Sequence, residues 1–246
     1  MEEHLTKKER KEQSKLERLS KMEEKNNGSK TKGLVIAGIV LLFLAFFGYS
    51  IYAAKSSQEK KLSTVVSLSD KGWVKGNAKS KITFTEFGDF QCPACAAFEP
   101  IYAQMSKEYG KDIKVVFKHY PIKSIHPNAF ASAVAAEAAG VQGKFWEFHD
   151  MLYAKQDEWS QLPDPTPTFL SYAKSLKIDT EKFEKDLGSS ALKNKVNSQV
   201  DEGIKVGVNS TPSLFINGKP IAIPSSYEAL KPQIEEAIKN SKSTKK

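Results

Sequence analysis

The stretch "TFTEFGDFQCPACAAFEP", residues 83–100, contains the only two cysteines of the 246-residue chain. Pro93 and Ala94 separate Cys92 from Cys95, so the two cysteines lie one turn apart if this segment is helical. Three interpretations fit such a pair: a redox-active dithiol, half of a zinc site, or two small buried side chains. The surrounding sequence has to decide between them.

The residues around the cysteines predict a strand, a helix and a second strand. Residues 81–90, "KITFTEFGDF", alternate in polarity and are rich in aromatic and β-branched side chains, which indicates a strand. After Cys92, apolar residues recur every three or four positions as far as Gly110, which predicts a helix. Residues 112–122, "DIKVVFKHYPI", predict a strand closed by Pro121. We therefore expect a βαβ unit with two parallel strands.

A helical block of about 80 residues, 125–206, follows this unit. Its first helix is expected to have Pro127 in the first turn and to stop at Gly140. A run of alanines in this helix lets neighbouring helices approach closely.

The chain then returns to strands. Residues 211–218 and 219–224 predict a pair of strands around an Asn-Gly turn. A last helix is expected to open with a capping box from Ser225 to Glu228. Together with the βαβ unit, these elements predict an α/β fold with a four-stranded mixed sheet and flanking helices.

Residues 33–54 form an apolar run of 22 positions without a charge, which as a helix would span roughly 33 Å, enough for a bilayer core. A buried core helix would show a polar face, and a cleaved signal peptide would have a shorter apolar run before small residues, whereas this run ends in Tyr49, Ile51 and Tyr52. An uncleaved transmembrane anchor is therefore predicted. Lys and Arg number six in the 20 residues before it and four in the 20 after it, which favours a cytoplasmic N-terminus.

The charge distribution argues against a nucleic-acid partner. The chain carries a formal charge of +8, but residues 55–246 hold 27 basic and 22 acidic side chains, spread along the sequence without aromatic interleaving. No Gly-rich phosphate loop or internal repeat is present in the sequence. A domain beyond the anchor would lie in a compartment where disulfides persist, which favours a redox role for the cysteines.

Proline is favoured at the first position of a helix, so Pro93 predicts that the helix begins directly after Cys92. Unpaired backbone N–H groups and the positive end of the helix dipole would then face Cys92 and lower the pKa of its thiol. Cys95 would point inward, one turn later, close enough to form a disulfide. This geometry suits dithiol exchange, in which one cysteine forms a mixed disulfide and the other resolves it.

Two further features support the redox interpretation. Glu86 is expected on a buried strand face, where desolvation would raise the pKa of its carboxyl and suit it to exchange a proton with Cys95; a solvated strand residue is the alternative. The Thr211-Pro212 pair opens a strand, where a proline is unusual unless it serves a backbone feature such as a cis bond.

The other two interpretations of the cysteines stay open. Zinc would need two more ligands, and no two of the four histidines have the spacing typical of zinc fingers. Each histidine is read as a packing or surface residue: His4, His119, His126 and His149. Two inert buried cysteines are the remaining alternative.

Three separated motifs, "EFGDFQCPAC", "HPNAFASAVAAEAAGVQGKFWEFHDMLY" and "GVNSTPSLFING", resemble the DsbA-like branch of the thioredoxin superfamily, in particular its membrane-anchored, BdbD-like members from Gram-positive bacteria. The resemblance covers about residues 70–240. It implies a thioredoxin fold with an inserted all-helical domain, preceded here by a single transmembrane helix. The implied segments are a cytoplasmic tail 1–32, the anchor 33–54, a tether 55–75, a first thioredoxin half 76–124, the helical insertion 125–206 and a second half 207–241.

The resemblance also implies roles for individual residues. Cys92 would be the exposed nucleophile, Cys95 the resolving cysteine and Glu86 the buried acid. Substrate binding would fall to four residues around the cysteines, with Pro212 as the family's cis-proline and the Thr211 backbone pairing with an extended peptide: Thr211, Pro212, Pro93 and Ala94. The sequence departs from the family pattern at Ala94, where the best-known oxidases of this family have a histidine.

The implied activity is that of an extracytoplasmic thiol-disulfide oxidoreductase which introduces disulfides into exported, unfolded proteins. The Cys92–Cys95 disulfide would be its redox group, with no bound cofactor and no metal. A quinone-linked membrane oxidoreductase of the DsbB or VKOR type would regenerate it, since the chain has no third cysteine. The alternatives are an anchored reductase, for example of haem apoproteins, and an anchored binding domain with a static disulfide.

Overall fold

The computed structural model describes residues 11–12, 14–22, 41–53 and 64–243. Contacts divide the chain into two units, residues 1–60 and 61–246. In the first unit, the described residues are helical. None of the helices in the described ranges is long and apolar enough to cross a membrane. Only residues 41–53 of the predicted anchor belong to these ranges, and most of the predicted tail lies outside them.

The second unit is built on a five-stranded sheet with the order β1-β3-β2-β4-β5. The parallel pairing of β2 with β3 confirms the predicted βαβ unit, and all other neighbours are antiparallel. The strands are β1 (Trp73–Gly76), β2 (Thr83–Gly88), β3 (Lys114–His119), β4 (Ser213–Ile216) and β5 (Lys219–Ile221). The sequence predicted four strands, because β1 is short and was assigned mostly to the tether.

Helix α2 (Pro93–Tyr109) connects β2 to β3, as predicted, and begins directly after Cys92. Its buried face packs on one side of the sheet, where Phe98 and Tyr102 contact Phe84 of β2. Because Glu86 is two residues beyond Phe84, its side chain lies on the same face of the strand. The strand that leads to the cysteines is therefore covered by the helix that carries them.

Helix α9 (Tyr227–Ser243) joins the same apolar cluster through Leu230 and Ile234. Ser226 caps its N-terminus, because the Ser226 hydroxyl accepts a hydrogen bond from the Ala229 amide at 3.3 Å. The predicted capping residue, Ser225, is thus one position too early.

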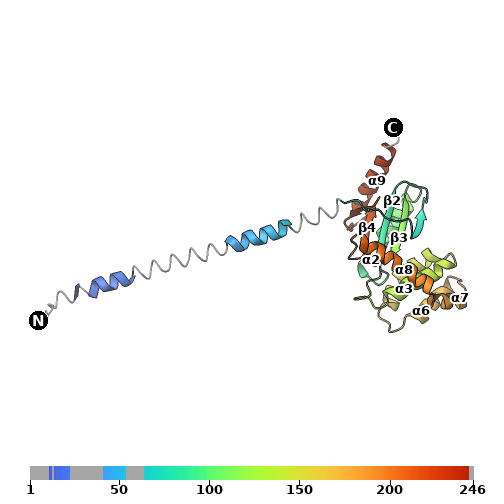
Figure 1. The fold of residues 1–246 in the computed structure, drawn as a ribbon, viewed down its shortest axis with the longest axis horizontal. Helices are drawn as coiled ribbons and strands as arrows, with labels where there is room; N and C mark the ends of the chain where they lie inside the picture. Colours follow the sequence, from blue (N-terminus) through green and yellow to red (C-terminus); the bar gives the residue numbers. More distant parts are fainter. Residues whose placement is uncertain (1–10, 13, 23–40, 54–63, 244–246) are drawn as a thin grey trace. The chain divides into compact units, whose positions relative to one another are not determined.

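Six helices separate β3 from β4 and make up the predicted helical insertion: α3 (Ala129–Val141), α4 (Phe145–Ala154), α5 (Gln156–Trp159), α6 (Thr166–Ser175), α7 (Thr180–Leu187) and α8 (Ser190–Lys205). Figure 1 shows α3, α6 and α7 together at one end of the unit, away from α9. Pro127 precedes α3 and does not lie in its first turn, because the helix begins after Asn128.

The core of the insertion is continuous with that of the sheet. One cluster of buried side chains contains Phe117 of β3, both cysteines, four alanines of α3 and three aromatic residues of α4: Ala135, Ala136, Ala138, Ala139, Phe145, Phe148 and Tyr153. Alanines at successive positions allow α3 to be buried on nearly all sides. The insertion therefore forms one wall of the cysteine site.

The second half of the predicted tether packs against the same unit. The Val66 amide donates to the Gly218 carbonyl at 2.8 Å. The fully buried Lys118 ammonium binds the Ser69 carbonyl at 2.8 Å and the Glu202 carboxylate at 2.6 Å. Residues 66–75 of the predicted tether are therefore part of the folded unit.

Candidate redox site

Cys92 is the N-cap residue of α2 and Pro93 is in the first turn, as the sequence predicted. Both cysteines are free in the structure. Cys92 is 7% exposed and Cys95 is 1% exposed. The expectation of an exposed nucleophile is therefore corrected: Cys92 is largely covered, although it is the more accessible sulfur of the two.

The two sulfurs have opposite electrostatic surroundings. A hydrogen bond from Cys95 is the main factor that lowers the pKa of Cys92 to about 5; the Thr211 side chain and the amides of Ala94 and Cys95 act in the same direction, against the effect of burial. Burial, followed by the hydrogen bond to Cys92 and the charge of Glu86, raises the pKa of Cys95 well above its ordinary value. At neutral pH the reduced pair therefore carries one thiolate, on Cys92.

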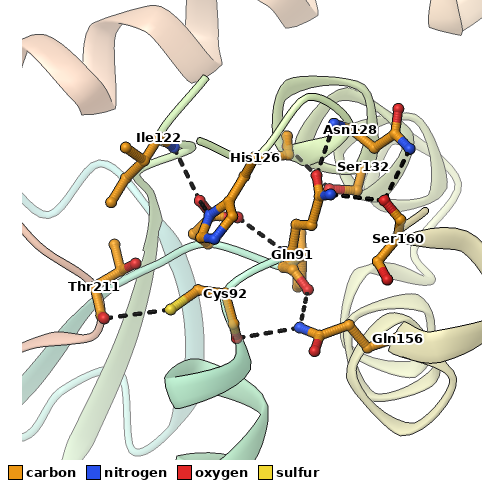
Figure 2. Close-up of polar contacts among 12 residues, drawn as sticks. Gln91, Cys92, Ile122, His126, Asn128, Ser132, Gln156, Ser160 and Thr211 are labelled. Carbon is orange, nitrogen blue, oxygen red and sulfur yellow. Dashed lines mark hydrogen bonds and ion pairs between the residues drawn. The ribbon is translucent and has the colours of Figure 1, made fainter. Parts of the chain in front are cut away.

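Thr211 lies against the nucleophile. The Cys92 thiol donates to the Thr211 carbonyl at 3.4 Å (Figure 2). The Thr211-Pro212 peptide bond is cis, as the sequence suggested. The buried Thr211 hydroxyl has no hydrogen-bond partner while the sulfur is protonated. When Cys92 ionises, this hydroxyl is available to donate to the thiolate, which accounts for its lowering effect on the Cys92 pKa.

Glu86 is 1% exposed, so the alternative of a solvated strand residue is wrong. Its Oε2 atom is buried without a partner. Burial, followed by the charges of Glu99 and Cys92, raises the pKa of Glu86 well above its ordinary value. A raised pKa makes the Glu86 carboxyl a better proton carrier than an exposed glutamate, and its charge acts on Cys95.

The cysteines do not form part of a metal-ligand cluster in the described part of the chain. The potential ligands that gather within 4.8 Å of one another there are Glu99, His149 and Asp150. The zinc interpretation of the cysteine pair therefore has no support from the arrangement of the described side chains.

A polar network beneath the cysteines could not be read from the sequence. The Gln156 side-chain amide, from α5, donates to the Phe90 carbonyl at 2.7 Å and to the Cys92 carbonyl at 3.1 Å (Figure 2). The Gln91 amide donates to the Ser160 carbonyl at 2.7 Å and its oxygen accepts from the Asn128 amide. The insertion thus holds the turn that leads into α2.

Asp89 holds the other side of this turn. Its carboxylate accepts from the amides of Gln91 at 2.8 Å and Ile122 at 2.9 Å, and lies 2.8 Å from His126 Nδ1. His126 was read as a packing or surface residue, and the structure places it here as a partner of a buried carboxylate. Neither residue has a spacing signal in the sequence, because the contact joins two loops 37 positions apart.

Comparisons with known proteins identify the family to which the chain belongs. The thioredoxin family model matches residues 68–236. Probable disulfide bond formation protein D of Bacillus cereus is 30% identical over 226 residues, which are 87% of this chain and 99% of the relative. The crystal structure of oxidised BdbD from Bacillus subtilis is 27% identical, with a TM-score of 0.63, and the match covers 72% of this chain and 97% of that one.

A different relative is much longer. The Na(+)/H(+) antiporter NhaA 3 of Salinispora tropica is 34% identical over 169 residues, or 69% of this chain, but the match spans only 25% of the antiporter. The similarity to this transporter is thus confined to a quarter of its length. The family model and the relative matched over nearly its whole length show that the chain belongs to the thioredoxin family and is related to the Bacillus cereus disulfide bond formation protein D.

Proposed function

We propose that this protein is a membrane-anchored, extracytoplasmic oxidase that donates the Cys92–Cys95 disulfide to exported proteins. The observation that carries the direction is the contrast between the two sulfurs: the pKa of Cys92 is lowered to about 5 and that of Cys95 is raised. A thiolate stabilised in the reduced form favours reduction of the pair, which makes its disulfide oxidising.

The donation proceeds in two exchanges. A substrate thiolate attacks Cys92 Sγ and the Cys92–Cys95 bond breaks; Cys95 leaves as a thiolate and takes up a proton, for which the Glu86 carboxyl is the buried donor. A second substrate thiolate then attacks the substrate sulfur of the mixed disulfide and releases Cys92. Two electrons pass from the substrate to the pair, and Cys92 is a good leaving group because its thiolate is stable.

The substrate would be an extended, unfolded polypeptide that lies along Thr211 and Pro212, with Pro93 and Ala94 at the other side of the sulfur. Backbone pairing of this kind recognises extended chain with little demand on sequence. Regeneration requires an oxidant, for which a quinone-linked membrane oxidoreductase of the DsbB or VKOR type is the proposed class. The similarity to a probable disulfide bond formation protein supports the proposed oxidase activity.

The location follows from the uncharged run 33–54 and the excess of basic residues before it. It can be tested with the native cysteines, since the chain has two and both lie after this run. A membrane-impermeant maleimide should label reduced Cys92 in intact cells, and the chain should stay in the membrane after a carbonate wash. Labelling only after the cells are broken would place the domain on the cytoplasmic side.

The direction of the reaction is tested by the reduction potential. The full chain is equilibrated with glutathione buffers and alkylation of the two cysteines is quantified. A potential near about −120 mV would establish a disulfide donor, whereas one near about −270 mV would establish the reductase. The reductase is the second candidate because Ala94 occupies the position of the histidine in the best-known oxidases. Cys92→Ser should abolish exchange in either case, and unchanged exchange would exclude a redox function.

A further inference from the structure

A group of potential metal-ligand side chains lies where α2, the helix that follows Cys92, meets α4 of the insertion. Glu99 is seven residues after Cys92 on α2, and His149 and Asp150 are on α4 of the insertion. One ligand atom of each residue lies within 4.8 Å of the others. These three residues, called here the α2–α4 cluster, take no part in the proposed exchange of disulfides.

His149 is fully buried and its ring orientation is determined by its surroundings. Aromatic rings enclose it, with Phe117 at 4.8 Å and Tyr153 at 5.1 Å between ring centroids. Its Nδ1 atom lies 2.8 Å from the Asp150 carboxylate, whereas its buried Nε2 atom has no partner. Burial is the main factor that lowers the pKa of His149, which favours the neutral ring. A neutral ring has one acceptor nitrogen: Nε2 while Nδ1 donates to Asp150, and Nδ1 in the other tautomer.

Glu99 has no hydrogen bond or ion pair among the described residues, although it is only partly exposed. Burial and then the negative charge of Asp150 raise the pKa of Glu99 to about 8, against the effect of Lys75. The Lys75 ammonium does not form an ion pair with the cluster and lies 5.0 Å from the centroid of the Trp146 ring. Among the residues that the structure describes, no lysine or arginine lies within 4.0 Å of either carboxylate.

We propose that Glu99, His149 and Asp150 bind one divalent transition-metal ion, of which Zn²⁺ is the representative. Imidazole nitrogen and carboxylate oxygen are both good ligands for Zn²⁺, whereas Ca²⁺ and Mg²⁺ favour oxygen alone. The His149 Nδ1 atom provides the nitrogen when its ring proton is on Nε2. Three protein ligands leave a fourth position for water, and the two carboxylates balance the charge of the ion.

Such an ion would link α2 to α4, and so join the helix that begins at Cys92 to the helical insertion. The ligands come from both sides of this contact, so an ion would bind the folded chain and not the unfolded one. Zinc should therefore stabilise the protein against thermal unfolding.

The test is a calorimetric titration of the full chain with Zn²⁺ in the oxidised form, because the Cys92–Cys95 disulfide removes the thiolates as competing ligands. We expect one ion per chain. Glu99→Gln and Asp150→Asn should each weaken binding at least about ten-fold, since even residues that only support a metal ligand cause losses of this size. Lys75→Gln should strengthen binding, because it removes a nearby positive charge.

Glu147→Gln is the matched control, because Glu147 is an acidic residue of α4 that pairs with Lys144 at 2.8 Å and lies outside the cluster. This variant should bind Zn²⁺ as the unchanged chain does. The rise in melting temperature with Zn²⁺ is the second readout and should disappear in the Glu99 and Asp150 variants. Asp150 is exposed and Glu99 is partly exposed, so these substitutions should leave the fold intact. The proposal is wrong if the oxidised chain binds no Zn²⁺, or if both variants bind it with unchanged affinity.

Discussion

The Cys92 sulfur lies 3.4 Å from the Thr211 carbonyl oxygen, although the two residues are 119 positions apart in the chain. This contact brings the turn before β4 onto the N-terminus of α2. The carbonyl accepts from the thiol, and the adjacent hydroxyl is free to donate to the thiolate. Thr211 therefore contacts the nucleophile in both of its protonation states.

Removal of the Thr211 hydroxyl should make Cys92 less acidic. Thr211→Val deletes a side-chain donor to the thiolate, so the pKa of Cys92 should rise from about 5. Absorbance of the thiolate near 240 nm, followed against pH in the reduced protein, measures this value. Thr211→Ser retains a hydroxyl and should keep the low pKa; equal values in the Val and Ser variants would contradict the assigned role.

The stability of the reduced form should depend on pH through Cys92. Its folded pKa of about 5 is below the ordinary value of 9.0, so the stabilising effect is complete above pH 9 and is lost as the pH falls towards 5. Thermal unfolding of both forms measures this effect. Between pH 5 and pH 9, the stability of the reduced form should increase relative to that of the oxidised form. Cys95 does not offset this gain, because its pKa is raised above the ordinary 9.0 and its cost to stability therefore grows only above this pH range. A difference that is constant with pH would exclude a low Cys92 pKa.

Glu86 should lower stability while it serves proton transfer. Its folded pKa is raised above the ordinary 4.5, so the cost of its burial is absent below pH 4.5 and grows as the pH rises. Glu86→Leu should therefore be more stable than the unchanged chain at pH 7, by about 1–3 kcal/mol, and the difference should shrink in acid. Urea unfolding measures this difference.

The same Glu86→Leu variant should protonate Cys95 more slowly. Formation of the mixed disulfide, followed by rapid acid quench at pH 7, should be slower than in the unchanged chain. Glu86→Gln provides a comparison of similar shape without a proton to donate, and it should be slow as well. Unchanged rates in both variants would assign Glu86 to the fold alone.

Gln156 should position the turn before Cys92. Gln156→Leu removes two hydrogen bonds to the Phe90 and Cys92 carbonyls, with an expected loss of about 1–3 kcal/mol in unfolding free energy. The reduction potential and the Cys92 pKa should also change, because the sulfur is attached to this turn.

The matched control for this variant is Gln142→Leu. Gln142 also makes two side-chain hydrogen bonds to the backbone, outside the redox site: it donates to the Asp179 carbonyl and accepts from the Asp179 amide. Gln142→Leu should lower the unfolding free energy by a similar amount and leave the reduction potential unchanged. If both variants leave the potential unchanged, Gln156 stabilises the fold without positioning the cysteine.

Glu137 should be required for docking of β1 and α8 on α3. Its buried carboxylate accepts from Trp73 Nε1 at 2.9 Å and Lys195 Nζ at 2.7 Å, and lies 3.2 Å from His119 Nε2. Burial raises the pKa of Glu137, but the nearby His119 ring and the hydrogen bond from Lys195 keep it below its ordinary value. Glu137→Gln should cost about 3–5 kcal/mol in urea unfolding at pH 7.

The cost of the Glu137 substitution should diminish in acid. The folded pKa is below 4.5, so the stabilising effect of the carboxylate is present above pH 4.5 and is lost as the pH falls through the folded value. A cost that stays the same at pH 3 would show that shape, and not charge, makes Glu137 necessary.

The sequence by itself determined the elements around the cysteines. The alternation in β2, the apolar period of α2 and the proline after Cys92 are local features, and local backbone and side-chain preferences act over a few residues. The same local signals predicted the parallel β2–β3 pair, the β4–β5 hairpin and the burial of Glu86. Strand β1 was missed because its four residues carry too short a pattern, and pairing with β3 supplies the hydrogen bonds that stabilise it.

Only the tertiary structure decided how far Cys92 is covered and what surrounds its sulfur. Thr211, Gln156 and Asp89 reach this turn from separate parts of the chain, and no spacing in the sequence records these contacts. The difference in pKa between the two cysteines depends on burial and on hydrogen bonds of these kinds, which exist only after the sheet and the insertion have packed together. The α2–α4 cluster has the same origin, since its three side chains meet where α2 contacts a helix of the insertion.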